Sequence, residues 1–168
     1  METSLTLSTL WGTNRWGTTV GAFKDSSGKM HGFKSFSDGN AIALDFAGSA
    51  QTAAGAINDS GTIVGTYSNH LAPSEWRHGF IYSNGKWATL DYPATLQTTL
   101  SGISNANLIV GTTIKGTTET GSFMYKNGSF KRIVLPNSNV PTYGRGVSAS
   151  KGLIAGFSGT TGFIATCN

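Results

Sequence analysis

Gly61-Thr-Ile-Val-Gly65 is one of four versions of a short sequence that recurs along the chain. The other versions are Gly17-Thr-Thr-Val-Gly21, Asn107-Leu-Ile-Val-Gly111 and Gly152-Leu-Ile-Ala-Gly156. The marks Val20-Gly21, Val64-Gly65, Val110-Gly111 and Ala155-Gly156 therefore lie 44, 46 and 45 residues apart. A period of this size is typical of a protein built from stacked supersecondary units.

A second mark follows the first in every copy and ends in phenylalanine. Its versions are His31-Gly-Phe33, His78-Gly-Phe80, Gly121-Ser-Phe123 and Thr161-Gly-Phe163. In the second copy we expect strands at about 52–57, 62–67, 78–82 and 86–90. The segments that join them carry Asn, Asp and Gly, which favour hairpin turns. Each copy is thus predicted to be a meander of four short antiparallel strands.

Radial packing of four such sheets covers their faces and protects their edges. The predicted fold is therefore all-β, a small four-bladed β-propeller that forms one domain over residues 1–168. The fourth copy ends at Asn168, before its last strand, and Thr3-Ser-Leu-Thr-Leu7 has the alternation of a strand. We expect this N-terminal strand to pair with the C-terminal repeat and close the ring. A β-sandwich or jelly roll is the main alternative, and an open solenoid would need distinct capping repeats.

Composition agrees with short strands and tight turns. The chain has 23 Gly and 12% charged residues, with a net charge of +4. Basic residues are scattered, with one modest cluster at Lys126, Lys131 and Arg132, so we expect no nucleic-acid partner. No apolar run approaches the length of a membrane helix, and no signal peptide is evident, so we expect no membrane insertion. Cys167 is the only cysteine, which excludes an internal disulfide.

Three phrases of the second copy resemble a known family. They are Gly55-Ala-Ile-Asn-Asp-Ser-Gly-Thr-Ile-Val-Gly-Thr-Tyr67 and His78-Gly-Phe-Ile-Tyr82, followed by Asn84-Gly-Lys-Trp-Ala-Thr-Leu-Asp-Tyr-Pro93. They are similar to the bacterial extracellular repeats called the HAF family, and the similarity covers essentially the whole chain. The resemblance implies propeller-like β-repeats and an exported, extracellular setting. It brings no catalytic residues with it.

Positions at which the copies disagree are free to serve a ligand. In the first strand of each copy, which should line the central channel, one position holds Trp11, Gly55, Ser101 and Arg145. Two residues earlier, on the same predicted strand face, stand Thr9, Ala53, Thr99 and Tyr143. We predict a lopsided axial pocket in which Trp11 and Tyr143 offer aromatic faces and Arg145 a cationic fork. The alternative is that the two aromatic side chains plug a narrow channel and Arg145 points to solvent.

The longest connection between a second and a third strand is a further candidate site. It belongs to the second copy and contains His70, Trp76 and Arg77. An indole beside hydrogen-bonding side chains suits stacking on a sugar ring, and loops on rigid scaffolds commonly carry binding residues. The alternative is an exposed loop that packs its own Trp76.

We expect neither a metal site nor a cofactor. His31 and His78 occupy equivalent positions, which favours a shared hydrogen-bonding role. Asp45 and Asp91 likewise occupy equivalent strand ends, and no carboxylate pair for glycoside hydrolysis is evident. The sequence contains no nucleophile elbow and no phosphate-binding loop.

The leading functional hypothesis is a noncatalytic propeller that binds a glycan or another polar small ligand. A cofactor-independent cyclase or isomerase, acting on a hydrophobic small molecule in the axial pocket, is the enzymatic alternative. In that case Trp11 would shape the substrate, Tyr143 would donate a proton or hydrogen bond, and Arg145 would stabilise an oxyanion. A protein-interaction module is the second alternative.

Overall fold

The protein is an all-β chain in the computed structural model, which describes residues 8–71, 77–115, 118–136 and 140–166. These residues form fifteen strands and no helix, so none of their segments is a helix able to cross a membrane. The first sheet contains β1 (Ser8–Thr13), β2 (Thr19–Lys24), β3 (Met30–Ser35) and β4 (Ala41–Leu44). The second contains β5 (Gln51–Ile57), β6 (Ile63–Ser68), β7 (Arg77–Ser83) and β8 (Lys86–Thr89).

The other two sheets repeat this plan. The third contains β9 (Gln97–Ile103), β10 (Ile109–Lys115), β11 (Thr118–Lys126) and β12 (Ser129–Ile133). The fourth contains β13 (Thr142–Val147), β14 (Leu153–Ser158) and β15 (Thr161–Thr166). Within each sheet the strands are antiparallel and follow in chain order, and the described part of the fourth sheet has three of them.

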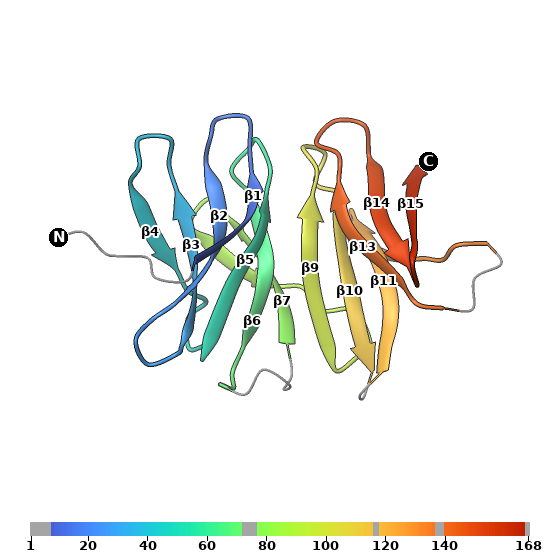
Figure 1. Ribbon diagram of the computed structural model, residues 1–168, viewed down its shortest axis with the longest axis horizontal. Coiled ribbons are helices and arrows are strands. Elements are labelled where there is room, and N and C mark those ends of the chain that lie inside the picture. Colours follow the sequence, from blue (N-terminus) through green and yellow to red (C-terminus); the bar gives the residue numbers. More distant parts are fainter. Residues whose placement is uncertain (1–7, 72–76, 116–117, 137–139, 167–168) are drawn as a thin grey trace.

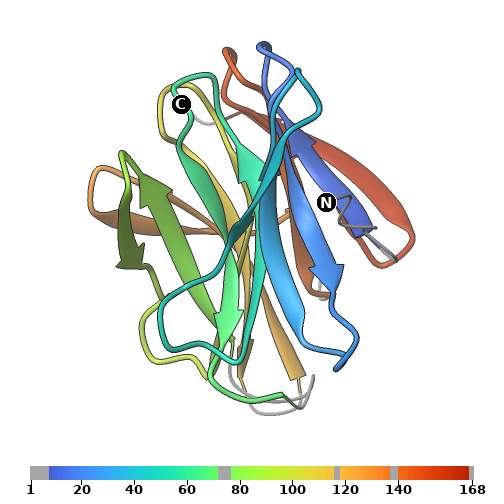
Figure 2. The same cartoon turned by 90° about the vertical axis from the view of Figure 1, so that its left-hand side faces the viewer.

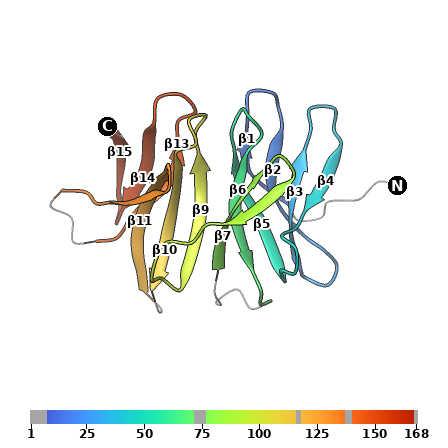
Figure 3. The same ribbon diagram turned by 180° about the vertical axis from the view of Figure 1, so that it is seen from behind.

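The four sheets are the blades of a small β-propeller, as the repeats predict. Figure 1 shows the first strands of the blades, β1, β5, β9 and β13, near the centre of the molecule, and the last strands of the first and fourth blades, β4 and β15, toward its sides. The side and rear views place β5–β8 and β9–β12 behind the blades that begin and end the chain (Figures 2 and 3). The turns between the first and second strands of all blades lie at one end, the upper end in Figure 1, which we call the turn end.

Contact between a glycine on the second strand and a phenylalanine on the third explains both sequence marks. Gly65 lies opposite Phe80 in the register of β6 and β7, and Gly111 lies opposite Phe123 in β10 and β11. A Cβ atom on Gly65 would lie 2.7 Å from the Phe80 ring. The glycine is required because only a hydrogen leaves room for the ring to lie across the strand.

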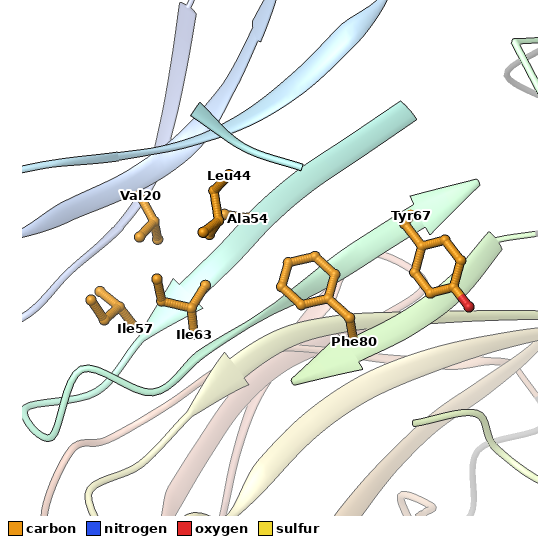
Figure 4. Close-up of a cluster of buried hydrophobic side chains, with 7 residues drawn as sticks. All are labelled: Val20, Leu44, Ala54, Ile57, Ile63, Tyr67 and Phe80. Carbon is orange, nitrogen blue, oxygen red and sulfur yellow. The ribbon is translucent and has the colours of Figure 1, made fainter. Parts of the chain in front are cut away.

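Each of the first three blades packs on the next through an apolar cluster. Val20 of the first blade joins Ala54, Ile57, Ile63 and Phe80 of the second, and all are less than one-tenth exposed (Figure 4). Val64 and Val110 begin the corresponding clusters at the next two blade interfaces. The valine of the first mark is therefore the residue that each of the first three blades presents to the blade after it.

The turns join neighbouring blades by hydrogen bonds at the turn end. Asn14 Nδ2 donates to the carbonyl of Asn58 at 3.2 Å, and Asn58 Nδ2 donates to the carbonyl of Ser104 at 3.2 Å. The third link runs from the amide of Asn105 to the carbonyl of Ala149 at 2.8 Å. Asn58 is 3% exposed, and its side-chain amide is satisfied on both sides: Nδ2 donates to the third blade, and Oδ1 accepts from Ser60 Oγ and the Thr62 amide of its own turn.

A β-bulge interrupts the first strand of every blade at the same repeat position. The register of β1 passes from Leu10 to Gly12, and the registers of β5, β9 and β13 skip one residue at the equivalent place. The skipped residues are Trp11, Gly55, Ser101 and Arg145. A bulged residue has no cross-strand partner and its side chain is re-aimed. The axial position found by comparing the copies is therefore the bulge.

The interface between the fourth and the first blade is less covered than the other three. Leu10 is 64% exposed, whereas its counterparts Ala54 and Leu100 are 0% and 1% exposed. Ile164 on β15 is 76% exposed. The predicted closing strand, Thr3 to Leu7, lies outside the described residues.

We predict that Gly65→Ala lowers the free energy of unfolding by about 1–3 kcal/mol, because the added methyl group meets the Phe80 ring and the β5 backbone. Gly146→Ala is the matched control, since a Cβ there has no atom within 4 Å, and it should change stability by no more than about 0.5 kcal/mol. Urea unfolding measures both variants. Equal effects would show that the glycine is not needed for the Phe80 contact.

Candidate functional site

A cavity of about 500 Å³ lies among the inner strands, where the bulges project. Its lining includes all four bulge residues, Trp11, Gly55, Ser101 and Arg145. The remaining lining residues come from β3, β5, β6, β7 and β9, and are Met30, Gln51, Thr52, Ala53, Thr66, Tyr67, Ser68, Arg77, Thr99 and Leu100. The cavity thus extends from the axis toward the end opposite the turn end, where β6 ends and β7 begins.

Trp11 and Arg145 bring aromatic and cationic character to the cavity from opposite ends of the chain. The Trp11 side chain is 49% exposed, so it does not plug the channel as a buried side chain would. Arg145 is also exposed, and its guanidinium carbon lies 5.2 Å from the centre of the Phe157 ring. This cation–π contact restricts where the charge of Arg145 can lie.

The other predicted axial residues divide into two groups. Thr99 and Ser101 line the cavity, and the Ser101 hydroxyl donates to the carbonyl of Gly144 at 2.9 Å. Tyr143 is not among the lining residues. Its ring stacks on Phe157, with the ring centres 4.8 Å apart and an angle of 7° between the planes. Tyr143 therefore supports the aromatic ring beneath Arg145 instead of facing the cavity.

The two sites predicted from the sequence partly coincide. Arg77, at the start of β7, lines the axial cavity. His70 is exposed, and its carbonyl accepts a hydrogen bond from Nε2 of the lining residue Gln51 at 3.2 Å. Trp76 lies outside the described residues. The long connection of the second blade thus begins and ends beside the cavity.

Sequence comparison missed several lining residues, of which Gln51, Tyr67 and Met30 are the most informative. Tyr67 is 8% exposed and stacks on Phe46, and its hydroxyl lies 3.0 Å from the Thr89 hydroxyl. Its repeat counterpart, Phe23, is also aromatic, so comparison of the copies gives no signal of a ligand at this position. Gln51 and Met30 are the first residues of β5 and β3, where alignment of the copies does not show which way a side chain points.

The cavity is positively charged. Arg77 and Arg145 are the only charged residues among those that the structure describes in its lining. The lining also contains hydroxyl and amide groups from Gln51, Thr66 and Thr99. A positive, partly aromatic cavity favours a polar ligand that carries oxygen atoms able to accept hydrogen bonds.

His31 and His78 lie outside the cavity and have the shared hydrogen-bonding role that their equivalent positions predict. His31 Nδ1 lies 2.7 Å from Asp45 Oδ2, and His78 Nδ1 lies 2.7 Å from Asp91 Oδ2. In the first blade His31 Nε2 also lies 3.2 Å from Asp25 Oδ2. Within the described ranges, no group of three or more His, Cys, Asp or Glu could hold a metal ion.

Comparisons with known proteins add no relative. No family model matches the chain, and no curated protein or solved structure matches it significantly. The resemblance to the HAF repeats thus remains an expectation from the sequence.

The ion pairs of His31 make part of the stability depend on pH. Partial burial of His31 opposes its charge, but hydrogen bonds to Asp45 and Asp25 outweigh this effect and raise the pKa of His31 above 6.5. Hydrogen bonds from Ser27 and His31 hold the pKa of Asp25 well below 3.8. The stabilisation from the raised pKa of His31 is fully present below pH 6.5, and it is lost as the pH rises through the pKa of His31 in the folded protein. The stabilisation from the lowered pKa of Asp25 is present above pH 3.8, and it is lost as the pH falls through the pKa of Asp25 in the folded protein.

We therefore predict that His31→Gln destabilises the protein more at pH 5.5 than at pH 8.5, because the charged pair exists only in the lower range. Urea midpoints of the variant and the unsubstituted protein at both pH values measure the difference. A loss of stability that is the same at both values would exclude a charged His31 in the folded state.

Proposed function

We propose that the protein is a noncatalytic propeller that binds a glycan, or another polar small molecule of similar size, in its axial cavity. The observation that carries the proposal is that the bulges of the first and fourth blades direct Trp11 and Arg145 to one cavity. Its volume of about 500 Å³ lies in the range of small-molecule sites, roughly 300–1,000 Å³.

Trp11 provides the stacking surface in this proposal. A half-exposed indole has a flat apolar face with a polar N–H at its edge. The face of a sugar ring that carries C–H bonds can lie on such a surface while its hydroxyls point away. The counterparts Gly55 and Ser101 are small, so space for a ligand lies beside the indole and not all around the axis.

Arg145 provides the polar contact. Its guanidinium offers several N–H donors in a fixed plane, which suit a carboxylate or a pair of adjacent hydroxyls. The second arginine of the lining, Arg77, adds positive charge, and no described lining residue is a carboxylate. We therefore expect acidic sugars to bind more tightly than neutral sugars of the same size.

The chemistry of the lining favours binding over catalysis. The described lining contains no His, Cys, Asp, Glu or Lys, and besides the arginines and the aliphatic hydroxyls of Ser and Thr its only proton-bearing acid–base group is the phenol of Tyr67, which lies 3.0 Å from the Thr89 hydroxyl. Proton transfer needs a donor or base within hydrogen-bond reach of the ligand. Tyr143, the expected proton donor of the isomerase alternative, packs on Phe157 outside the lining.

A glycan array of neutral and acidic sugars, followed by calorimetric titration of the best ligand, tests the proposal. Trp11→Ala should raise the Kd by about thirtyfold, equivalent to about 2 kcal/mol, because it removes the stacking surface. Arg145→Gln should weaken acidic ligands more than neutral ones. Trp16→Ala is the control, because Trp16 is a 59% exposed indole in the turn between β1 and β2.

Two results would contradict the axial site. One is the absence of binding to every sugar and polar ligand tried. The other is binding that Trp11→Ala leaves unchanged, above all if Trp76→Ala abolishes it, since the ligand would then be held by the long connection of the second blade.

A further inference from the structure

A second depression, with a volume of about 380 Å³, lies between the third and fourth blades at the turn end. It is formed by the turn after β9, the end of β11, the start of β12 and the turn after β13. Its lining residues are Ser104, Ala106, Leu108, Met124, Lys126, Ser129, Lys131, Ser150, Lys151 and Gly152. We call it the lysine groove. None of these residues lines the axial cavity, so the groove is a separate site.

Three lysines give the groove a concentrated positive charge. Lys126, Lys131 and Lys151 are all exposed, and the described lining contains no carboxylate. Met124 and Lys131 are register partners in β11 and β12, and Lys126 lies two residues beyond Met124. Both lysines therefore project from the same face of the sheet as a diagonal pair, at a separation of about 7–8 Å. This face is the one that packs toward the fourth blade, because Met124 contacts the cluster formed with Ile154.

The repeat does not require these lysines. The register aligns Lys131 with Ala88 and Ile42 in the two earlier blades. The phenylalanine mark aligns Lys126 with Phe36, Ser83 and Thr166, and the glycine of the first mark aligns Lys151 with Trp16, Ser60 and Ala106. Every counterpart is uncharged. Two other blades lack a charge at the position of Lys131, and three lack one at the positions of Lys126 and Lys151, so the three charges of this groove have no architectural explanation.

Like charges gathered without a counter-ion repel one another and weaken the folded state. A ligand with several anionic groups would relieve this repulsion, and Ser129 and Ser150 add hydroxyl groups along the same surface. The described lining has no aromatic residue, whereas binding of single-stranded nucleic acid usually combines positive charge with aromatic stacking. The groove therefore fits an anionic saccharide chain better than a nucleic acid.

We infer that the lysine groove is a second binding site, independent of the axial cavity, for an oligosaccharide that carries sulfate or carboxylate groups. The three ammonium groups contact successive anionic groups of the chain, and the blade interface beneath them keeps the three lysines in register. Binding is electrostatic, so its affinity falls as the salt concentration rises.

Calorimetric titration with a heparin hexasaccharide at low salt tests the site. The triple variant K126Q/K131Q/K151Q should raise the Kd by about tenfold or more, because each exposed contact contributes a small but additive amount. The control triple variant K24Q/K34Q/K86Q has the same net charge, with substitutions on β2, β3 and β8, and should change the Kd by less than about twofold. Thermal unfolding verifies that both variants are folded.

Further titrations distinguish binding in the lysine groove from binding in the axial cavity and from attraction by net charge alone. Trp11→Ala should leave heparin binding unchanged, so a failure of the axial site and a failure of the groove can be told apart. Carboxylated oligogalacturonate identifies whether sulfate is required, and an uncharged dextran oligosaccharide should not bind. Equal weakening by the two triple variants would overturn the inference, since binding would then follow net charge alone. So would the absence of heparin binding, or tighter binding of a single-stranded oligonucleotide of equal charge.

Discussion

Close packing of a phenylalanine ring on a glycine backbone is the contact on which the blades depend. Gly65 and Phe80 show it in the second blade, where a single methyl group on the glycine would displace the ring. The buried ring contributes to the blade interface together with Val20 and Ile63. Because a propeller is stable only when its blades cover each other's faces, this contact within a blade also determines how closely the blades approach.

The position of the candidate site follows from the same repetition. Each inner strand bulges at one place, and four bulges around an axis place four residues at the centre, one of them a glycine without a side chain. Where the copies carry Gly55 and Ser101 the bulge leaves space, and where they carry Trp11 and Arg145 it supplies contacts. The scaffold is thus nearly symmetric and the cavity is not, because a bulged side chain has no cross-strand partner to restrict its identity.

Charge is distributed over the repeats in two different ways. Acidic residues are largely used within the structure, as Asp45 and Asp91 are by their histidines and Asp59 is by Arg15 and Asn105. The arginines of the cavity and the lysines of the groove instead stand on linings whose described residues include no carboxylate. Five of the twelve basic residues therefore line two hollows, one at the axis and one at the turn end.

The sequence alone determined the repeat, the strands and the axial position. Strands expected at about 52–57, 62–67, 78–82 and 86–90 are found at 51–57, 63–68, 77–83 and 86–89, because turn residues and alternation are local properties. The disagreement of Trp11 and Arg145 with their counterparts also identified lining residues of the cavity. The tertiary structure decided the rest. Tyr143 stacks on Phe157, and Arg77 lines the axial cavity. Lysines from separate strands and turns line one groove. Such contacts depend on bulges, twist and blade packing, which a strand period of two residues does not encode.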